Sequence, residues 1–449
     1  MNAPAPGATL LRGGTLLTVD GTRRVFVGDL LIEAGRITKL GDAEHPIAPP
    51  PGARVLDVRG CAVMPGLVQA HTHLCQTLCR GAADDLPLLS WLKERVWPYE
   101  AALDEAAMRA SARLAIAELL LSGTTAILDM GTVHETDALA DELAMSGLRA
   151  TIGKAMMDTG DGVPTRLRET TAASLAESDA LQRRWSGAAD DRLRYAYAPR
   201  FVLSCTEALL REVAARLGAG ARLHTHASEQ LAECALVRDE RGDDNISYFG
   251  ALGLVGPRSA LAHCVHPTQA ERQLLARTGA HVVHCPSSNL KLGSGIAPIP
   301  EMLVEGISVA LGADGAPCNN NLDGFMELRL AALLHKHRVG TGALPAAVAL
   351  ELATLGGARA IGREDEIGSL ELGKRADVVV LELDTIHGVP SPDPTSQVVY
   401  AAQSRDVRHV FVDGRHLVAD GVLTPSTGLA RDEVIARARS EARRVMGRI

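Results

Sequence analysis

A regular alternation of strand-like and helix-like segments runs through the middle of this sequence. The apolar runs that are typical of buried strands are Leu67–His73, Thr124–Asp129, Ala150–Met156, Leu193–Ala198, Arg222–His226, Ala260–His263, His281–His284 and Ser308–Gly312. Segments of helical periodicity, such as Asp104–Leu121 and Thr206–Leu217, lie between them. The alternation predicts an α/β fold, and eight such units over roughly 290 residues are typical of a (β/α)8 barrel. A doubly wound parallel sheet would show the same alternation, so the pattern leaves that architecture open.

The two ends of the chain differ from the middle and are typical of strands separated by glycine turns. Apolar and polar residues alternate at period two in Val25–Ile32 and Ile37–Leu40, and strand-like runs return in Ala376–Leu383 and His409–Val412. We expect residues 1–63 and 368–449 to form a small accessory β-sandwich beside a barrel of residues 64–367. The last segment, Arg431–Gly447, predicts an amphipathic helix whose arginines form a solvated face.

Histidines mark the ends of the predicted strands. The chain has 15 histidines, and several of them, with one aspartate, close successive strands. These strand-end residues are His71, His73, His226, His263, His284 and Asp314. Because alternate residues of a strand face the same side, His71 and His73 can both point into one opening. Barrel enzymes keep their reactive groups at the carboxyl-terminal face of the strands, so this placement predicts a metal site at the barrel mouth.

The residue types narrow both the metal and the chemistry. Neutral imidazoles with one carboxylate suit Zn²⁺ or Fe²⁺, whereas Mg²⁺ and Ca²⁺ prefer oxygen ligands. A catalytic metal also activates a water molecule by lowering the pKa of that water. Glu229, three residues after His226, is placed to shuttle a proton beside this water, and His263 is placed to orient it.

Composition excludes several other classes of function. The net charge is −8 and aromatic residues make up 3% of the chain, which argues against binding to nucleic acid or to an anionic membrane. The apolar stretch Ala112–Ser122 is interrupted by Arg113 and Glu118, so no membrane span is expected. No secretory signal is visible in Met1–Leu11, and eight cysteines are too few for a disulfide scaffold. We therefore expect a cytoplasmic protein that acts on a small molecule.

Several motifs resemble those of the amidohydrolase superfamily. The resemblance rests on Met64–His73, on His226 with Glu229, on His263 and Asp314, and on Gly368–Asp377, and it covers nearly the whole chain. Within the superfamily, shorter motifs resemble the branch of 5′-deoxyadenosine, methylthioadenosine and S-adenosylhomocysteine deaminases, to which the triazine hydrolases are related. These motifs are Leu78–Gly81, Trp91–Leu92, Ser287–Lys291 and Asp314–Asn320.

The resemblance implies one divalent metal ion in each chain, zinc in the first place and iron as the alternative. The implied ligands are His71, His73, His226 and Asp314. The resemblance further implies that Glu229 protonates a ring nitrogen of the substrate and that His263 positions the attacking water. Asp314 would take the proton from that water as it adds to the ring.

The same resemblance implies a set of substrate contacts. Trp91 would pack on the base, Glu100 would accept hydrogen bonds from ribose hydroxyls, and Arg166 would bind a distal carboxylate. Gln76 and Arg200 depart from the nucleoside pattern and resemble the guanine deaminases, in which such residues contact the purine. The expected activity is hydrolytic deamination of the adenine of a 5′-modified nucleoside in purine salvage, with a guanine-type purine or a triazine as the alternative substrate. A barrel that has become a non-catalytic scaffold is the alternative from another class.

Other residues have roles that the sequence leaves open or assigns to structure. Lys154 could bridge a second metal as a carboxylated lysine or simply line the barrel, and His284 could contact substrate or form a structural hydrogen bond. His224 is expected in the core, and Cys75 and Cys79 are expected to be small buried side chains. We also expect the protein to be a homo-oligomer.

Overall fold

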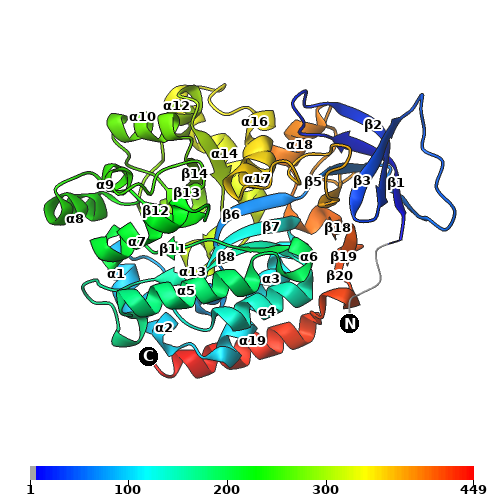
Figure 1. Ribbon diagram of the computed structural model, residues 1–449. Coiled ribbons are helices and arrows are strands. Elements are labelled where there is room, and N and C mark those ends of the chain that lie inside the picture. Colours follow the sequence, from blue (N-terminus) through cyan, green and yellow to red (C-terminus); the bar gives the residue numbers. More distant parts are fainter. Residues whose placement is uncertain (1–6) are drawn as a thin grey trace.

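The computed structural model describes residues 7–449 and has an α/β architecture (Figure 1). The parallel strands are β6 (Leu67–His73), β7 (Thr124–Met130), β8 (Arg149–Gly153), β10 (Leu193–Tyr195), β12 (Leu223–Ala227), β13 (Ser259–His263), β14 (His281–His284), β15 (Ser308–Leu311) and β16 (Asp314–Gly315). They pair in the orders β10-β8-β7-β6-β16 and β12-β13-β14-β15, and a bridge between Tyr197 and Leu223 links the two sheets. Since β16 pairs with β6, the strands taken in chain order return to the first one. The α/β fold with parallel sheets is therefore confirmed, and the carboxyl ends of the strands meet at one face.

Three of the predicted strands are each divided in two. The third becomes β8 and β9 (Ala155–Met156), the fourth becomes β10 and β11 (Ala198–Pro199), and the eighth becomes β15 and β16. β9 and β11 pair in a small parallel sheet of their own. These breaks lie toward the carboxyl ends of the strands, where the chain leaves the main ladder and approaches the site described below.

Helices flank the parallel strands (Figure 1). The longer ones are α3 (Glu105–Leu121), α4 (Thr136–Ser146), α5 (Thr171–Trp185), α7 (Glu207–Gly218), α8 (Leu231–Arg241), α10 (Gln269–Thr278), α14 (Gly324–Leu334) and α19 (Arg431–Met446). The shorter ones are α6 (Ala188–Asp191), α9 (Asn245–Ala251), α11 (Pro286–Lys291), α12 (Ile299–Val304), α13 (Ala316–Asn319), α15 (Lys336–Val339), α16 (Ala346–Glu351), α17 (Gly357–Ala360) and α18 (Pro394–Tyr400). Asp104, Thr170 and Thr206 cap the helices that follow them by accepting a backbone N–H.

Small apolar side chains from the parallel strands form one buried cluster. It contains Val68, Ala70, Ala126, Leu128, Ala260, Val283 and Ala310, together with Ala358 and Ala360 of α17. Such small residues allow the strands to approach closely, and α17 packs beside the first residues of β6. The apolar packing therefore fills the space between the parallel strands, and the polar site described below lies at their carboxyl ends.

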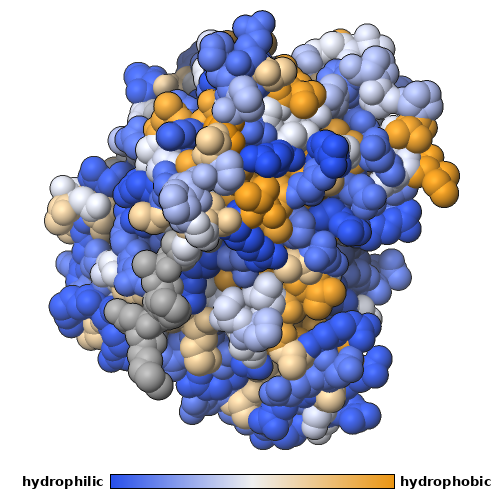
Figure 2. All heavy atoms as spheres, turned by 90° about the vertical axis from the view of Figure 1, so that its right-hand side faces the viewer, coloured by the Kyte–Doolittle hydropathy of each residue, from blue (hydrophilic) through white to orange (hydrophobic). Residues whose placement is uncertain are grey.

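The amino- and carboxyl-terminal strands join in a single nine-stranded sheet. Its strands are β1 (Thr9–Leu17), β2 (Val25–Glu33), β3 (Arg36–Asp42), β4 (Arg54–Asp57), β5 (Cys61–Pro65), β17 (Val378–Glu382), β18 (Val407–Val412), β19 (Arg415–Ala419) and β20 (Val422–Leu423). β5 pairs with β17 in antiparallel register and leads through Gly66 into β6. A side chain at Gly66 would place its Cβ 2.0 Å from Oγ1 of Thr125, so this junction requires glycine. Figure 2 shows the side of the molecule on which strands β1 to β3 of this sheet lie. The surface there is mostly hydrophilic, with separate apolar patches.

One segment covers the carboxyl-terminal face of the strands, and we call residues Leu88–Ala102 the lid segment. It consists of α1 (Leu88–Trp91), a π-helical turn (Leu92–Val96) and α2 (Trp97–Ala102). Its apolar side chains pack with Val163, Phe201 and Leu292 in a cluster separate from the main core. None of the helices within residues 7–449 has the length and hydrophobicity needed to cross a bilayer.

The carboxyl-terminal helix α19 differs in one respect from the sequence prediction. Arg444 is half-buried, and it is paired as well as solvated, because both of its terminal nitrogens donate to the carboxylate of Asp104, at 2.6 and 2.5 Å. Arg448 also donates to Asp104 and to the carbonyl oxygen of Ala102. The sequence pattern shows the charge of these arginines but not the acidic N-cap, far away in the chain, that α19 meets after folding.

Candidate active site

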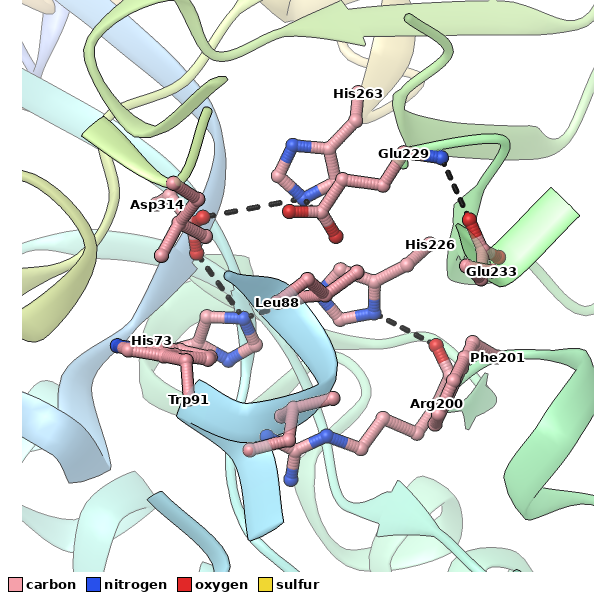
Figure 3. A pocket seen from close by; sticks show the side chains of 12 residues that line it. His73, Leu88, Trp91, Arg200, Phe201, His226, Glu229, Glu233, His263 and Asp314 are labelled. Atoms are coloured by element: carbon pink, nitrogen blue, oxygen red, sulfur yellow. Dashed lines mark hydrogen bonds and ion pairs between the residues drawn. The ribbon is translucent and has the colours of Figure 1, made fainter. Parts of the chain in front are cut away.

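The ends of β6, β12, β13 and β16 bring four histidines and one aspartate together. Figure 3 shows His73, His226, His263 and Asp314 of this group. Nε2 of His71 and Nε2 of His73 each lie 3.3 Å from Oδ1 of Asp314. Nε2 of His73 lies 3.2 Å from Nε2 of His226. His71 also belongs to a second group of close ligand atoms, with His226 and His263. Four of the five strand-end imidazoles that the sequence singled out, and the carboxylate, are thus neighbours in space, and the fifth, His284, lies outside these groups.

The hydrogen bonds of the Nδ1 atoms of His73 and His226 show which ring nitrogen of each imidazole carries the proton. Nδ1 of His73 donates to the carbonyl oxygen of Met130 and Nδ1 of His226 donates to that of Arg200, both at 2.7 Å. Their Nε2 atoms therefore carry no proton in the neutral rings, and yet they face each other. Burial lowers the pKa of His73 to about 3 and holds that of His226 well below its ordinary value, so neither ring takes up a proton. Two bare nitrogens this close are the arrangement that a shared cation satisfies.

His71 has the same design, through a residue that the sequence assigned to the core. Its Nδ1 lies 2.6 Å from Nε2 of the buried His224. Its Nε2 is buried and finds no hydrogen-bond partner among residues 7–449. The donor set of three imidazoles and one carboxylate, with Nε2 atoms turned inward, fits Zn²⁺ or Fe²⁺. His224 is thus an orienting neighbour of the site, and its position two residues before His226 on the same strand was the available signal.

Two residues of α11 orient the remaining groups. Asn289 places its Oδ1 2.9 Å from Nδ1 of His263, and Ser288 donates its hydroxyl to Oδ2 of Asp314 at 2.7 Å. Although burial alone would raise it, the neighbouring imidazoles, that of His71 first, hold the pKa of Asp314 well below its ordinary value. Sequence reasoning did not assign Ser288 or Asn289 to the site. Their place directly after β14, at the carboxyl end of a strand, was the signal that could have found them.

Glu229 lies beside this cluster with a carboxyl group that holds its proton. Burial first, and then the charges of Asp314 and Glu233, raise its pKa well above the ordinary value. Its Oε2 lies 3.5 Å from Nε2 of His263, and its backbone N–H donates to Glu233 (Figure 3). Oε1 of Glu229 has no hydrogen-bond partner in residues 7–449. A neutral carboxyl group with a free oxygen at a pocket wall can donate a proton to a bound molecule.

The backbone at three of these strand ends has unusual conformations. Ser228, His263 and Asp314 have φ angles of 50°, 70° and 65°, in the left-handed region that residues other than glycine rarely adopt. Such strain is found where side chains must be aimed in a particular direction. The strained positions support the view that this face of the strands is the functional one.

A pocket opens onto the cluster beneath the lid segment. Its apolar lining side chains are Leu88, Trp91, Leu92, Phe201 and Leu292. Its polar lining side chains are His73, Arg200, His226, Glu229, Glu233, His263 and Asp314. Trp91 is buried in the pocket wall, as expected for a residue that packs on a flat ring, and Nε1 of its indole has no partner in the described part of the chain.

The other residues expected to contact substrate differ in position. Arg200 lines the pocket, whereas Glu100 and Gln76 are buried behind it and hydrogen-bonded to each other at 2.8 Å. Arg166 is exposed on the loop before α5 and donates to the carbonyl oxygen of Ala101. The structure therefore brings Trp91 and Arg200 to the wall of the pocket, and leaves Gln76, Glu100 and Arg166 outside it.

The profile of the amidohydrolase family matches residues 62–417. The chain belongs to this family. It is 42% identical to 5-methylthioadenosine/S-adenosylhomocysteine deaminase of Halobacterium salinarum over 96% of both chains. It is 40% identical to 5′-deoxyadenosine deaminase of Methanothermobacter thermautotrophicus, over 92% of this chain and 94% of the relative. An adenosine deaminase from Xanthomonas campestris, solved with bound zinc, is 32% identical and superimposes with a TM-score of 0.91 over 99% of this chain and all of that one.

The amidohydrolase family is metal-dependent, and its fit to this chain agrees with the donor set described above. Two further residues of this amidohydrolase lie apart from the pocket wall. Lys154 is fully buried and donates to Glu169 and Glu177, at 2.6 and 3.1 Å, which is a structural ion pair. His284 is buried against His335, with 5.7 Å between the ring centroids.

Proposed function

We propose that this amidohydrolase deaminates the adenine ring of 5′-modified nucleosides. The substrates would be 5′-deoxyadenosine, methylthioadenosine and S-adenosylhomocysteine, and the products ammonia and the corresponding inosine-type nucleoside. The observation that carries the proposal is the position of the buried Glu229 in the same pocket as the histidine–aspartate cluster and the buried Trp91. Burial there raises the pKa of Glu229 well above its ordinary value. The near-full-length similarity to deaminases of these nucleosides supports the choice of substrate.

One metal ion, zinc with iron as the alternative, would be held by His71, His73, His226 and Asp314. When bound, it would supply Lewis acidity that makes a water molecule nucleophilic at neutral pH. The inward Nε2 atoms and the outer hydrogen bonds to Met130, Arg200 and His224 support this assignment.

The protein's own groups would then move the protons of the reaction. The attacking water gives one proton to Asp314 as its oxygen adds to C6, while Glu229 gives its proton to the neighbouring ring nitrogen. His263, between Glu229 and Asp314, would hold the water in line with the ring. The amino group leaves as ammonia after it receives the proton from Asp314. The C6 hydroxyl gives its remaining proton back to Glu229 as the C6 carbonyl forms, and the ring nitrogen keeps its hydrogen.

Trp91 would pack on the base, and Arg200, which also lines the pocket, would contact the substrate. Arg166, exposed beside the end of the lid segment, is proposed for the distal carboxylate of a long substrate such as S-adenosylhomocysteine. Gln76 would act behind the wall through its hydrogen bond to Glu100.

A substrate panel on the purified protein tests the proposal. Ammonia release from the three nucleosides should exceed release from guanine and from a triazine. Turnover of guanine or of the triazine alone would contradict the nucleoside assignment and favour the alternative substrates. Metal analysis addresses the scaffold alternative, because an enzyme should retain about one zinc or iron ion per chain.

Glu229→Gln tests the proton transfer. The amide has the same shape but cannot donate a carboxyl proton, so kcat should fall by about 100-fold or more while the metal content stays at the parental level. Leu231→Gln, an exposed change two residues along the chain, serves as the control and should keep parental kcat. Parental turnover of Glu229→Gln would refute the role of Glu229.

Three further assignments complete the proposal. The architecture would be a (β/α)8 barrel of residues 64–367 with an accessory β-sandwich of residues 1–63 and 368–449, supported by the ring of parallel strands and by the nine-stranded sheet. A cytoplasmic role in purine salvage agrees with eight cysteines that are all unpaired. A homo-oligomer is proposed from the sequence, and sedimentation measurements would test it.

A further inference from the structure

Glu100 is the centre of a buried hydrogen-bond network behind the pocket. Its side chain is fully buried and its two oxygens accept four hydrogen bonds. Oε1 accepts from Nη2 of Arg200 at 3.0 Å and from Nε2 of Gln76 at 2.8 Å. Oε2 accepts from Nη1 of Arg200 at 2.6 Å and from the hydroxyl of Thr132 at 2.8 Å. A carboxylate has about four acceptor sites, so Glu100 has none left for a ribose hydroxyl.

The partners of Glu100 are connected to the metal-site histidines through the backbone. The carbonyl oxygen of Arg200 accepts from Nδ1 of His226, as drawn in Figure 3. Thr132 stands two residues after Met130, whose carbonyl oxygen accepts from Nδ1 of His73. The network therefore fixes the two segments that aim His226 and His73 at the centre of the site.

Gln76 connects the same network to the aspartate. A Cβ at Gly315, the residue after Asp314, would lie 2.2 Å from Oε1 of Gln76. The side chain of Gln76 thus fills the space beside Gly315, the residue after Asp314, while its amide donates to Glu100. Of the four proposed metal ligands, His73, His226 and Asp314 therefore have neighbours in this network, and His71 has none among the contacts described.

We propose that Glu100 is a positioning residue for the metal site, and that it couples the lid segment to the aim of the metal-binding histidines. Glu100 belongs to α2 of the lid segment, so a displaced lid would remove the carboxylate from Arg200 and Thr132 together. The buried Arg200 would then lose the acceptors of its charge, and its carbonyl oxygen would no longer be held against His226. The inference rests on the proposed metal-dependent function.

Thr132→Val provides a test that leaves every ligand and every pocket-lining side chain in place. Valine has the shape of threonine but cannot donate to Glu100, so the metal-loaded variant should release its zinc to an excess of chelator about 10-fold faster than the parent. Gln76→Met removes the other neutral donor and should act in the same direction. Thr151→Val is the matched control, because Thr151 is a fully buried strand threonine whose hydroxyl has no partner in residues 7–449. It should release zinc at the parental rate.

Glu100→Gln separates the positioning role from contact with a ribose. A positioning residue predicts faster zinc release and an altered absorption spectrum of the cobalt-substituted protein, with thermal midpoints measured alongside. A ribose ligand predicts instead a raised KM for nucleosides with an unchanged release rate. Parental zinc release in folded Thr132→Val or Gln76→Met would overturn the inference. A parent protein that binds no stoichiometric metal would overturn the proposed function instead, so the two failures are distinguishable.

Discussion

At the scale of single residues, side chains behind the strand-end residues of the site hold them in place through hydrogen bonds. Ser288 and Asn289 orient Asp314 and His263, and they stand on α11, which begins beside another buried carboxyl group. This group is Glu327 of α14, which accepts from the backbone N–H of Ser287 at 3.0 Å. Burial raises the pKa of Glu327 to about 8, so the folded protein holds a neutral acid there at pH 7.

The pKa of Glu327 predicts a specific pH dependence of stability. The unfolded chain releases the proton near the ordinary pKa of 4.5, whereas the folded chain keeps it until about 8. Between pH 4.5 and 8 the folded state therefore binds more protons than the unfolded state. The contribution of Glu327 to the free energy of unfolding is complete below pH 4.5 and is lost progressively as the pH rises to 8. Glu327→Gln removes this titration. Denaturation midpoints from pH 4.5 to 8.5 should therefore fall with pH in the parent relative to the variant. Glu240→Gln, at an exposed position, is the control and should show the same pH dependence as the parent. If Glu327→Gln also shows the pH dependence of the parent, the raised pKa of Glu327 is contradicted.

At the scale of elements, the lid segment is held at its carboxyl-terminal end by the helix α19. Its last residue, Ala102, accepts from Arg448, and the following N-cap of α3, Asp104, accepts from Arg444 and Arg448 of α19. Asp104 also accepts from the backbone N–H of Ala107. The hydrogen bonds from Arg444 and the backbone N–H of Ala107 hold the pKa of Asp104 well below its ordinary value. The carboxylate of Asp104 therefore caps α3 and also binds the carboxyl-terminal helix α19 beside the lid segment.

Substitutions of Asp104 separate these two roles. Asp104→Ala loses both the cap and the arginine pairs, and should lower the free energy of unfolding by about 1 to 2 kcal/mol. Asp104→Asn keeps a capping oxygen and loses only the charge, so its effect should be smaller. Urea denaturation measures the loss, and hydrogen exchange should show reduced protection in the lid segment for both variants. An equal effect of the two substitutions would contradict a contribution from the cap.

At the scale of the whole molecule, a buried ion pair joins the parallel strands to the nine-stranded sheet. Arg149 of β8 donates to both carboxylate oxygens of Asp377, at 2.8 and 2.9 Å, and both side chains are buried. Asp377 also accepts from the backbone N–H of Asp413 at 2.8 Å. This ion pair links the parallel strands to the nine-stranded sheet. We therefore expect these two parts of the protein to unfold together.

Arg149→Met should therefore destabilise the whole protein. The substitution leaves a buried carboxylate without its counter-ion, which costs about 3 to 5 kcal/mol in comparable pairs. The double variant Arg149→Met with Asp377→Asn should recover a large part of the loss, because asparagine is neutral and can still accept from Asp413. Denaturation followed by circular dichroism and by tryptophan fluorescence checks both expectations. Two separate transitions in the parent would contradict the joint unfolding.

The sequence by itself determined the α/β class and the set of strand-end residues from which the metal site is built. Both follow from local properties, since periodicity reports the type of element and parallel strands bring their carboxyl ends to one face. The tertiary structure alone decided which partners those residues meet. His224 reaches His71, Glu100 is saturated by Arg200, and Arg444 finds Asp104. Pairings of this kind join residues 100 or more positions apart. The partner of a buried polar group depends on which groups the packing brings next to it, so a local sequence pattern does not predict it.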